Sequence, residues 1–328
     1  MTRTHPAAMR ALRKAAILVL LGAACTAVAE PAPADVPEAF RVAQPTRAPL
    51  IAVTRAGPRL VAVGDYGVVV LSDDAGTTWR QAHAVATRDL LTAVTFVDAN
   101  RGFAVGHGGT ILRTEDGGES WLRVREAPDE GPLLAVWFED ARHGIAVGAF
   151  GVALETRDGG GHWTRIDVGE GELRDRHLNG IVAVGDGTLL ITAEAGALFR
   201  SSDGGRSWSL QKLPYNGSLW GGLALRDGAV LVFGMRGHVL RSDDQGRTFA
   251  DIPSGTNQSF TAGTQQTGGT IVLVGLGGTI AQSKDGGRTY EVIVRPERQT
   301  FTSVVEAASG QLVLTATTGV VKPGAATR

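Results

Sequence analysis

The sequence predicts an all-β protein, a seven-bladed β-propeller of four-stranded blades whose ring is closed by an N-terminal strand. A short motif recurs six times at a near-constant spacing, and a glycine turn precedes each copy. The composition agrees, because 45 of the 328 residues are glycine and only 6% are aromatic, which is typical of short strands joined by tight turns. A repeat of about 40–50 residues that holds four strands indicates a propeller blade.

The repeated motif, here called the Asp box, reads Ser/Thr-x-Asp-x-Gly-x-x-aromatic. Its copies occupy residues 72–79, 114–121, 156–163, 201–208, 242–249 and 283–290. The aspartates are separated by 42, 42, 45, 41 and 41 residues and are Asp74, Asp116, Asp158, Asp203, Asp244 and Asp285. A carboxylate two residues before a glycine can accept backbone N–H bonds within the turn, so we expect the boxes to hold the fold, with each aromatic wedged between blades. A calcium loop would need more oxygen ligands and a closing Glu, so we predict no metal site.

The glycine turns give the blade count. Each Asp box follows a small-x-x-Gly turn, and a seventh such turn stands at residues 316–319. The seventh unit has candidate strands near residues 302–306, 312–315 and 320–322, but Pro323 and the end of the chain leave it without a fourth. Residues 38–44 stand one strand ahead of the first blade, so we expect them to pair with the last blade and close the ring, which removes exposed strand edges.

The first 29 residues predict a signal peptide. Four basic residues precede an apolar run over residues 15–29 that ends Ala27-Val28-Ala29, and this run is too short for a membrane span. We expect cleavage near Ala29 and a periplasmic or secreted chain. The single cysteine, Cys25, lacks the apolar residue three positions earlier that a lipoprotein signal has, so lipidation is not expected.

The predicted organisation therefore has four parts. These are a signal peptide (1–29), an extended lead-in with the closing strand (30–46), the propeller (47–323) and a tail (324–328).

Charge and position indicate where a partner would bind. With 32 basic and 33 acidic residues, no global field favours nucleic acid or an anionic membrane, so a charged partner must meet a local patch. We expect that patch at the mouth of the central channel, where the glycine turns and the loops entering the inner strands form one face. The rim residues predicted there are Arg47, Arg88, Arg176, Arg236, Arg298, Tyr66, His107, Phe150 and Trp220. Such a rim suits an acidic segment or a chain terminus, although ordinary solvated loops would look similar.

No catalytic template fits well, so we expect no enzyme activity and no cofactor. The glycines lie in hairpins rather than at the start of a helix, and the histidines lack metal-ligand spacing. The alternative is a carbohydrate-active propeller, either a sialidase-like or glycosidase-like hydrolase or a lectin. It would use Tyr66 and Glu194, with Trp220 stacking on a sugar ring.

The phrase at residues 106–121, Gly-x-x-Gly-x-x-x-Arg-Thr-x-Asp-x-Gly-x-x-Trp, resembles the Asp-box (BNR-like) repeat propellers of the photosystem II stability and assembly factor family. The resemblance covers about residues 40–322. It implies a non-catalytic scaffold that binds a protein partner, and its bacterial relatives are commonly associated with resistance-nodulation-division (RND) type exporters. A membrane transport or assembly complex is therefore the expected partner of a protein that is monomeric on its own and at most peripheral to the membrane. Because Asp boxes also occur in sialidases and some glucan hydrolases, the carbohydrate-active alternative stays open.

Overall fold

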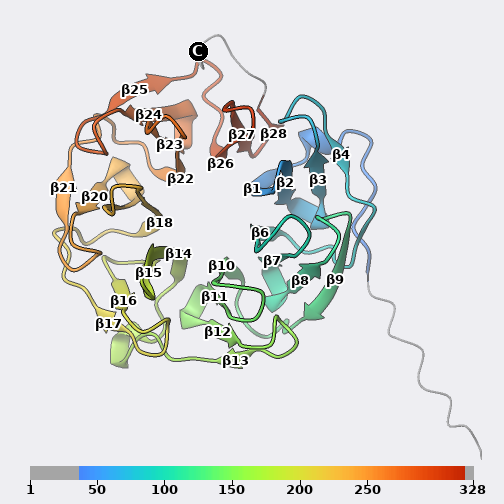
Figure 1. Ribbon diagram of the computed structural model, residues 1–328, viewed down its shortest axis with the longest axis horizontal. Coiled ribbons are helices and arrows are strands. Elements are labelled where there is room, and N and C mark those ends of the chain that lie inside the picture. Colours follow the sequence, from blue (N-terminus) through green and yellow to red (C-terminus); the bar gives the residue numbers. More distant parts are fainter. Residues whose placement is uncertain (1–36, 322–328) are drawn as a thin grey trace, which may run out of the picture. The chain divides into compact units, whose positions relative to one another are not determined.

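The computed structural model describes residues 37–321, so the predicted signal peptide, residues 30–36 and the tail from residue 322 lie outside the described residues. Residues 37–321 form seven β-sheets arranged in a ring (Figure 1). Six of the sheets contain a four-stranded blade, and the seventh has three strands within this range. The prediction of an all-β, seven-bladed propeller is confirmed.

Each blade starts with its inner strand and proceeds outward. Blades 1 and 2 contain β1 (Leu50–Ala56), β2 (Arg59–Gly64), β3 (Val69–Ser72), β4 (Arg80–Gln81), β6 (Leu91–Phe96), β7 (Gly102–Gly106), β8 (Ile111–Thr114) and β9 (Ser120–Arg125), with the short β5 (Ala84–Val85) parallel to β9. Blades 3 and 4 contain β10 (Leu133–Phe138), β11 (Gly144–Gly148), β12 (Ala153–Thr156), β13 (Thr164–Arg165), β14 (Leu178–Gly185), β15 (Thr188–Ala193), β16 (Leu198–Ser201) and β17 (Ser209–Leu210). Blades 5 to 7 contain β18 (Leu219–Ala224), β19 (Val230–Gly234), β20 (Val239–Ser242), β21 (Ala250–Ile252), β22 (Phe260–Gln265), β23 (Ile271–Gly275), β24 (Thr279–Ser283), β25 (Glu291–Val294), β26 (Phe301–Glu306), β27 (Leu312–Ala316) and β28 (Gly319–Val320).

Short 3-10 turns connect these strands. They are η1 (Pro45–Arg47), η2 (Asp65–Gly67), η3 (His107–Gly109), η4 (Ala149–Gly151), η5 (Gly171–Leu173), η6 (Met235–Gly237) and η7 (Leu276–Gly278).

The second strand of the blade lies in the centre of the core. Every residue of β7, β11, β19 and β23 is buried, and the side chains of Val61, Phe103 and Leu231 have no exposed area. A strand covered on both faces needs a continuous apolar run, which explains why these segments lack the alternation of a half-buried strand.

The Asp box closes the turn between the third and fourth strands. In blade 1, Asp74 Oδ1 accepts hydrogen bonds from the Thr78 N–H at 2.8 Å and from the Ser72 hydroxyl at 2.9 Å. The Ser72 oxygen in turn accepts the Gly76 N–H at 2.8 Å. The same bonds recur around Asp116, Asp158, Asp203, Asp244 and Asp285. The six carboxylates therefore hold their own turns, as the sequence indicated.

Each box also docks on the preceding blade. Trp121 of blade 2 packs into the core of blade 1, and Trp79 of blade 1 packs beside Val305 of blade 7. The box glycine touches the same neighbour, because a Cβ on Gly160 would come within 2.8 Å of the Phe103 ring, and its φ is +84°. The box glycine thus lets two blades approach closely in a backbone conformation that other residues rarely adopt.

An arginine strengthens this docking. Arg113 Nη1 donates to the Gly159 carbonyl at 3.3 Å, and Arg200 Nε donates to the Gln245 carbonyl at 3.0 Å. In both cases the arginine stands just before the Ser or Thr of its own box and reaches the box of the next blade. The Arg-Ser/Thr phrase in the repeat therefore has a structural reason, which is contact between neighbouring blades.

The inner strands add a second set of contacts between blades. All seven have a register shift at their second residue, where the strand forms a bulge. In four blades a polar side chain at this position donates to the first inner-strand carbonyl of the next blade. These pairs are Thr92 with Leu133, Asn179 with Leu219, Thr261 with Phe301, and Thr302 with Leu50.

The bond from Thr302 to Leu50 joins blade 7 to blade 1 at 2.6 Å. Replacing Thr302 by Val keeps the shape but leaves the Leu50 carbonyl without this donor, so we expect the free energy of unfolding to fall by about 1 kcal/mol. Urea denaturation measures it. Thr317→Val, at an exposed turn position of the same blade, is the control and should change stability by less than about 0.5 kcal/mol. Equal effects of the two variants would contradict a role of Thr302 in closing the ring.

The lead-in takes a different position from the one predicted. Residues 38–44 form no strand and do not pair with blade 7. The Ala39 N–H donates to the Val85 carbonyl at 2.9 Å, and the Val42 N–H donates to Gln81 Oε1 at 3.2 Å. The prediction of a closing strand is therefore corrected. Arg41 also donates to the Ala82 carbonyl at 2.8 Å, so the lead-in runs along the outer edge of blade 1, beside the segment that follows β4.

Contacts at η1 complete the ring instead. Gly319 of blade 7 packs so closely on η1 that a Cβ there would come within 1.9 Å of the Thr46 carbonyl. At the junction of blades 1 and 2, Gly67 packs similarly closely against the Thr87 carbonyl. The entry to blade 1 thus serves as an ordinary linker between blades.

Candidate functional site on the glycine-turn face

The glycine turns and the linkers between blades form one face of the ring. The Gly67 N–H donates to the Asp89 carbonyl at 2.9 Å, and the Gly151 N–H donates to the Arg176 carbonyl at 3.0 Å. Each turn is therefore bonded to the linker that enters the next inner strand. The Asp boxes lie at the opposite ends of the strands, as strand direction requires.

Three turn tips on this face hold a large side chain in the left-handed region of backbone conformation. Tyr66, Phe150 and Arg236 have φ values of +53°, +54° and +56°, whereas blades 2 and 6 have Gly108 and Gly277 at the same position. This conformation costs a residue other than glycine about 1–2 kcal/mol. Tyr66 is 57% exposed and Phe150 is 60% exposed, so burial does not offset that cost. Strain at exposed aromatic positions points to a use in binding.

At the junction of blades 1 and 2, two aromatic rings and an arginine side chain lie together. The rings of Phe40 and Tyr66 lie 6.2 Å apart in an edge-on arrangement, and the Arg88 guanidinium lies 4.4 Å from the Phe40 ring centre. Arg88 Nε also donates to the Glu38 carbonyl at 2.9 Å. Arg88 therefore helps to hold the lead-in in place.

The junction of blades 3 and 4 has a similar pair. The rings of Phe150 and His177 lie 4.8 Å apart, and the Phe150 N–H donates to His177 Nδ1 at 3.2 Å. Arg176, the residue before, is half-buried, and its Nε atom is buried without a hydrogen-bond partner. An anionic group bound here would supply the acceptor that this Nε lacks.

A cavity of about 490 Å³ opens at the junction of blades 4 and 5. Glu194, Arg236 and His238 line it, and the rings of Tyr215 and His238 stack at 4.0 Å. The Tyr215 hydroxyl donates to the Met235 carbonyl at 3.2 Å, and burial raises the pKa of this tyrosine. A second cavity of about 300 Å³ also has Arg236 and His238 in its lining. The site offers an aromatic wall beside a cation.

The rim arginines share an electrostatic property. Among residues 37–321, none of the five forms an ion pair with a carboxylate, while arginines near the boxes, such as Arg59 and Arg241, do. Arg47 donates instead to Gln44 Oε1 at 3.0 Å. Arg298 is exposed, with φ +47°, in the linker between β25 and β26. The positive charge of the rim is thus left for a partner to neutralise.

The predicted rim residues lie on this face as turn tips or linker residues, with one exception. Trp220 is the bulged second residue of the inner strand β18 and is half-buried. His107 is exposed at the start of η3.

Two of the junctions are linked, because the His177 N–H donates to Glu194, which lines the cavity beside Tyr215. Among residues 37–321, the Phe40–Tyr66 pair has no ring contact with either of the other two aromatic pairs.

Phe40, Tyr215 and His238 were missed from the sequence. Phe40 was assigned to a strand of blade 7, and only the path of the lead-in places it beside Tyr66. Tyr215 stands in the linker before β18, so the rule that selected the arginines before inner strands could have found it.

The residues of the carbohydrate-active alternative do not converge. Tyr66 lies at the tip of blade 1, and Glu194 follows β15 in blade 4, with no contact between them among the described residues. One Glu194 carboxylate oxygen accepts the His177 N–H at 3.0 Å. Nothing in this geometry favours the nucleophile pair that the alternative requires.

Residues 37–321 contain no helix long and apolar enough to cross a membrane. They also bring no three His, Cys, Asp or Glu side chains together as a metal site.

Comparison with known proteins identifies the family. No curated protein sequence matches the chain significantly. A structure described as YCF48 bound to D1 peptide is similar, with a TM-score of 0.69 and 19% identity over 89% of this chain and 98% of its own. YCF48 from Cyanidioschyzon merolae has a TM-score of 0.68 and 16% identity over 84% of this chain and 95% of its own. The WD40 propeller domain of Doa1 has a TM-score of 0.67 and 14% identity, with coverages of 87% and 94%. The model of the family described as photosynthesis system II assembly factor YCF48 matches residues 71–220 and 120–250, which is more than half of the sequence, and the chain therefore belongs to that family.

Proposed function

We propose that this protein is a non-catalytic scaffold whose glycine-turn face binds an acidic segment or a chain terminus of a protein partner. The observation that carries the proposal is the set of five rim arginines without a carboxylate partner among residues 37–321. Beside them, the strained turn tips Tyr66 and Phe150 present exposed aromatic rings. Arginine binds carboxylates through paired, charge-assisted hydrogen bonds, and aromatic anchors are common in interfaces.

A relative supports the class of partner. The similar structure of YCF48 has a peptide of D1 bound, which makes a protein segment a reasonable ligand for this chain as well. The predicted signal peptide, cleaved near Ala29, would place the protein in the periplasm or outside the cell. We propose a membrane transport or assembly complex there, such as an RND-type exporter, as the partner of a monomeric propeller that stays peripheral to the membrane.

The test compares partner capture by matched variants. The full chain, tagged at its C-terminus, is used to capture proteins from a detergent-solubilised envelope extract of its own source, followed by mass spectrometry. The variant Phe150→Gly/Arg236→Glu/Arg298→Glu should lose the captured partner by about tenfold or more. Glycine adopts the φ of residue 150 without strain, so this substitution is not expected to unfold the protein.

The control is Arg165→Glu/Arg206→Glu. Both arginines are exposed and lie outside the glycine-turn face, on β13 and in the box of blade 4. Capture should persist in this variant and should weaken as salt rises, because exposed charges are screened within about 8–10 Å. Equal capture by both variants would refute the rim as the binding site.

A further inference from the structure

The outer edge of blade 7 differs from the outer edges of the other six blades. In those blades a fourth strand covers the third, namely β4, β9, β13, β17, β21 and β25. Within residues 37–321, blade 7 ends at β28, and the lead-in that was expected to cover it lies on blade 1.

The backbone of β28 faces that open side. Val320 pairs with Thr315, and the Val321 N–H donates to the Leu314 carbonyl at 3.0 Å. Antiparallel residues alternate between bonded and non-bonded positions, so the N–H and C=O groups of Val320 point away from β27. A strand edge of this kind can pair with an extended segment of another chain.

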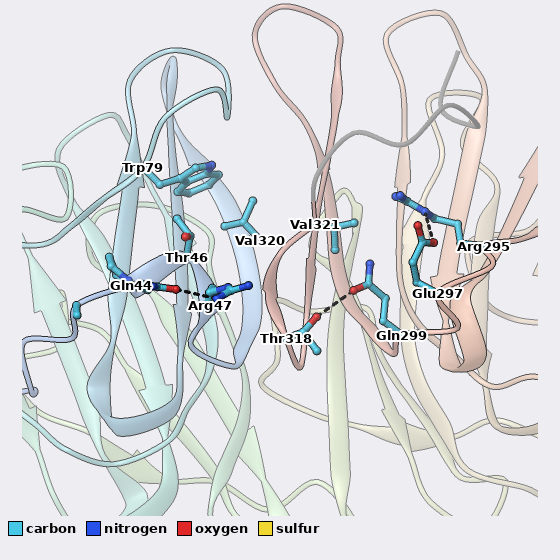
Figure 2. Close-up of a pocket in the computed structure, with 12 residues that line it drawn as sticks. Gln44, Thr46, Arg47, Trp79, Arg295, Glu297, Gln299, Thr318, Val320 and Val321 are labelled. Atoms are coloured by element: carbon cyan, nitrogen blue, oxygen red, sulfur yellow. Dashed lines mark hydrogen bonds and ion pairs between the residues drawn. The ribbon is translucent and has the colours of Figure 1, made fainter.

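A cavity of about 600 Å³ lies on the same side (Figure 2). Trp79, Val320 and Val321 supply its apolar wall. Figure 2 shows Trp79 and Val320 on the side of blade 1, and Val321 facing the linker between blades 6 and 7. The cavity therefore lies between blades 7 and 1, and its apolar wall stands beside the unpaired backbone groups of β28.

The polar part of the cavity is basic. Arg295 and Glu297 form an ion pair at 3.5 Å and so neutralise each other. Arg47 has no carboxylate partner among the described residues, and its side chain is exposed. The positive charge of Arg47 is therefore available to pair with an acidic group of an occupant.

The other blades indicate what chemistry fills such a position. Their outer segments place an aliphatic side chain on the core, such as Val124 in β9, Ile293 in β25 and Ile166, which directly follows β13. In β25, Ile293 follows the acidic Glu291. An extended segment with an aliphatic residue near an acidic one would therefore match both the apolar wall and the free arginine.

We infer that blade 7 binds an extended segment of a partner protein in the place of a fourth strand. Its backbone pairs with Val320, an aliphatic side chain packs on Trp79 and Val321, and an acidic side chain or terminal carboxylate binds Arg47. Arg47 is shared with the rim, so this inference rests on the proposed function and adds to it a strand-pairing contact at the junction of blades 7 and 1.

The test uses a peptide of known sequence as the probe. A synthetic peptide with the sequence of residues 283–294, the box and fourth strand of blade 6, is titrated into the full chain by calorimetry. Saturable one-to-one binding is expected, together with slower hydrogen exchange at residues 318–321. A peptide with the same composition in scrambled order is the control and should not bind.

Variants of the full chain localise the binding. Arg47→Glu should weaken the affinity about tenfold or more, while Arg165→Glu, a surface arginine of blade 3, leaves it unchanged. Val320→Pro, which removes the free N–H, should weaken the affinity more than Val320→Ala, which shortens the same side chain but keeps that N–H. The variant Phe150→Gly/Arg236→Glu changes the rim at blades 3 and 5 and leaves the cavity lining intact. It should bind the peptide normally, so failure of the rim proposal and failure of this one are distinguishable.

Three outcomes would overturn the inference. The first is the absence of saturable binding, and the second is binding that Arg47→Glu and Val320→Pro leave intact. The third is binding only to a chain cut after Lys322 or only on dissociation of a dimer, because the occupant would then be this protein's own tail or a second copy rather than a partner.

Discussion

Replacement of Trp121 by alanine should lower the free energy of unfolding by about 4 kcal/mol, the range for large aromatic side chains in a core. Trp121 is 1% exposed and packs between blades 1 and 2. The substitution removes its edge-on contact with Phe96, whose ring centre lies 5.9 Å away, and the bond from its Nε1 to the Gly118 carbonyl at 2.9 Å. The effect should be large because the cavity would open at a junction where two sheets meet.

Urea denaturation followed by circular dichroism measures the change. Leu122, the next residue, is 65% exposed, so Leu122→Ala should shift stability by less than about 0.5 kcal/mol. If both variants lost the same stability, the contact between blades would not depend on the box aromatic.

Acid should destabilise the propeller through its six Asp boxes. The Ser207 hydroxyl and backbone N–H lower the pKa of Asp203 from 3.8 to about 2. Hydrogen bonds within the turns also lower the pKa of each of the other five box carboxylates. A folded pKa below the unfolded value means that the stabilisation is complete above 3.8 and is lost as pH falls through about 2. The melting temperature should therefore stay nearly constant down to about pH 5 and fall steeply below about pH 4.

Asp203→Asn isolates one box. The amide cannot titrate and accepts fewer bonds, so the variant should be less stable at neutral pH and should approach the wild type in acid. Asp186→Asn, in the hairpin between β14 and β15, is the control for removing an aspartate outside the boxes in the same blade. Parallel pH curves for Asp203→Asn and the wild type would show that the box carboxylates do not cause the acid loss.

The repeat was readable from the sequence because its physical requirements are local. A carboxylate such as Asp74 bonds within its own turn, and Gly76 takes a positive φ that few residues adopt. These needs recur in six blades, so the spacing of the boxes together with a seventh glycine turn predicted seven units and the place of each box aromatic between blades. The faces of the ring also followed, because strand direction alternates along every blade.

The candidate site was only partly readable. The rule that linkers and turn tips share one face placed Arg176, Arg236 and Phe150 on the glycine-turn face, where the structure also has them. It could not find the contact of Phe40 with Tyr66, because these residues meet only through the path of the lead-in.

By itself, the sequence determined the fold class, the blade count and the turns that hold the blades, because those depend on residues close together in the chain. Only the tertiary structure decided where residues 38–44 lie, how the ring closes through Thr302, and which cations lack a carboxylate partner within residues 37–321. Those features join residues far apart in the chain, and the preference between two edges of a ring depends on the summed contacts at each edge. Short extended segments carry too little pattern to choose between such edges in advance.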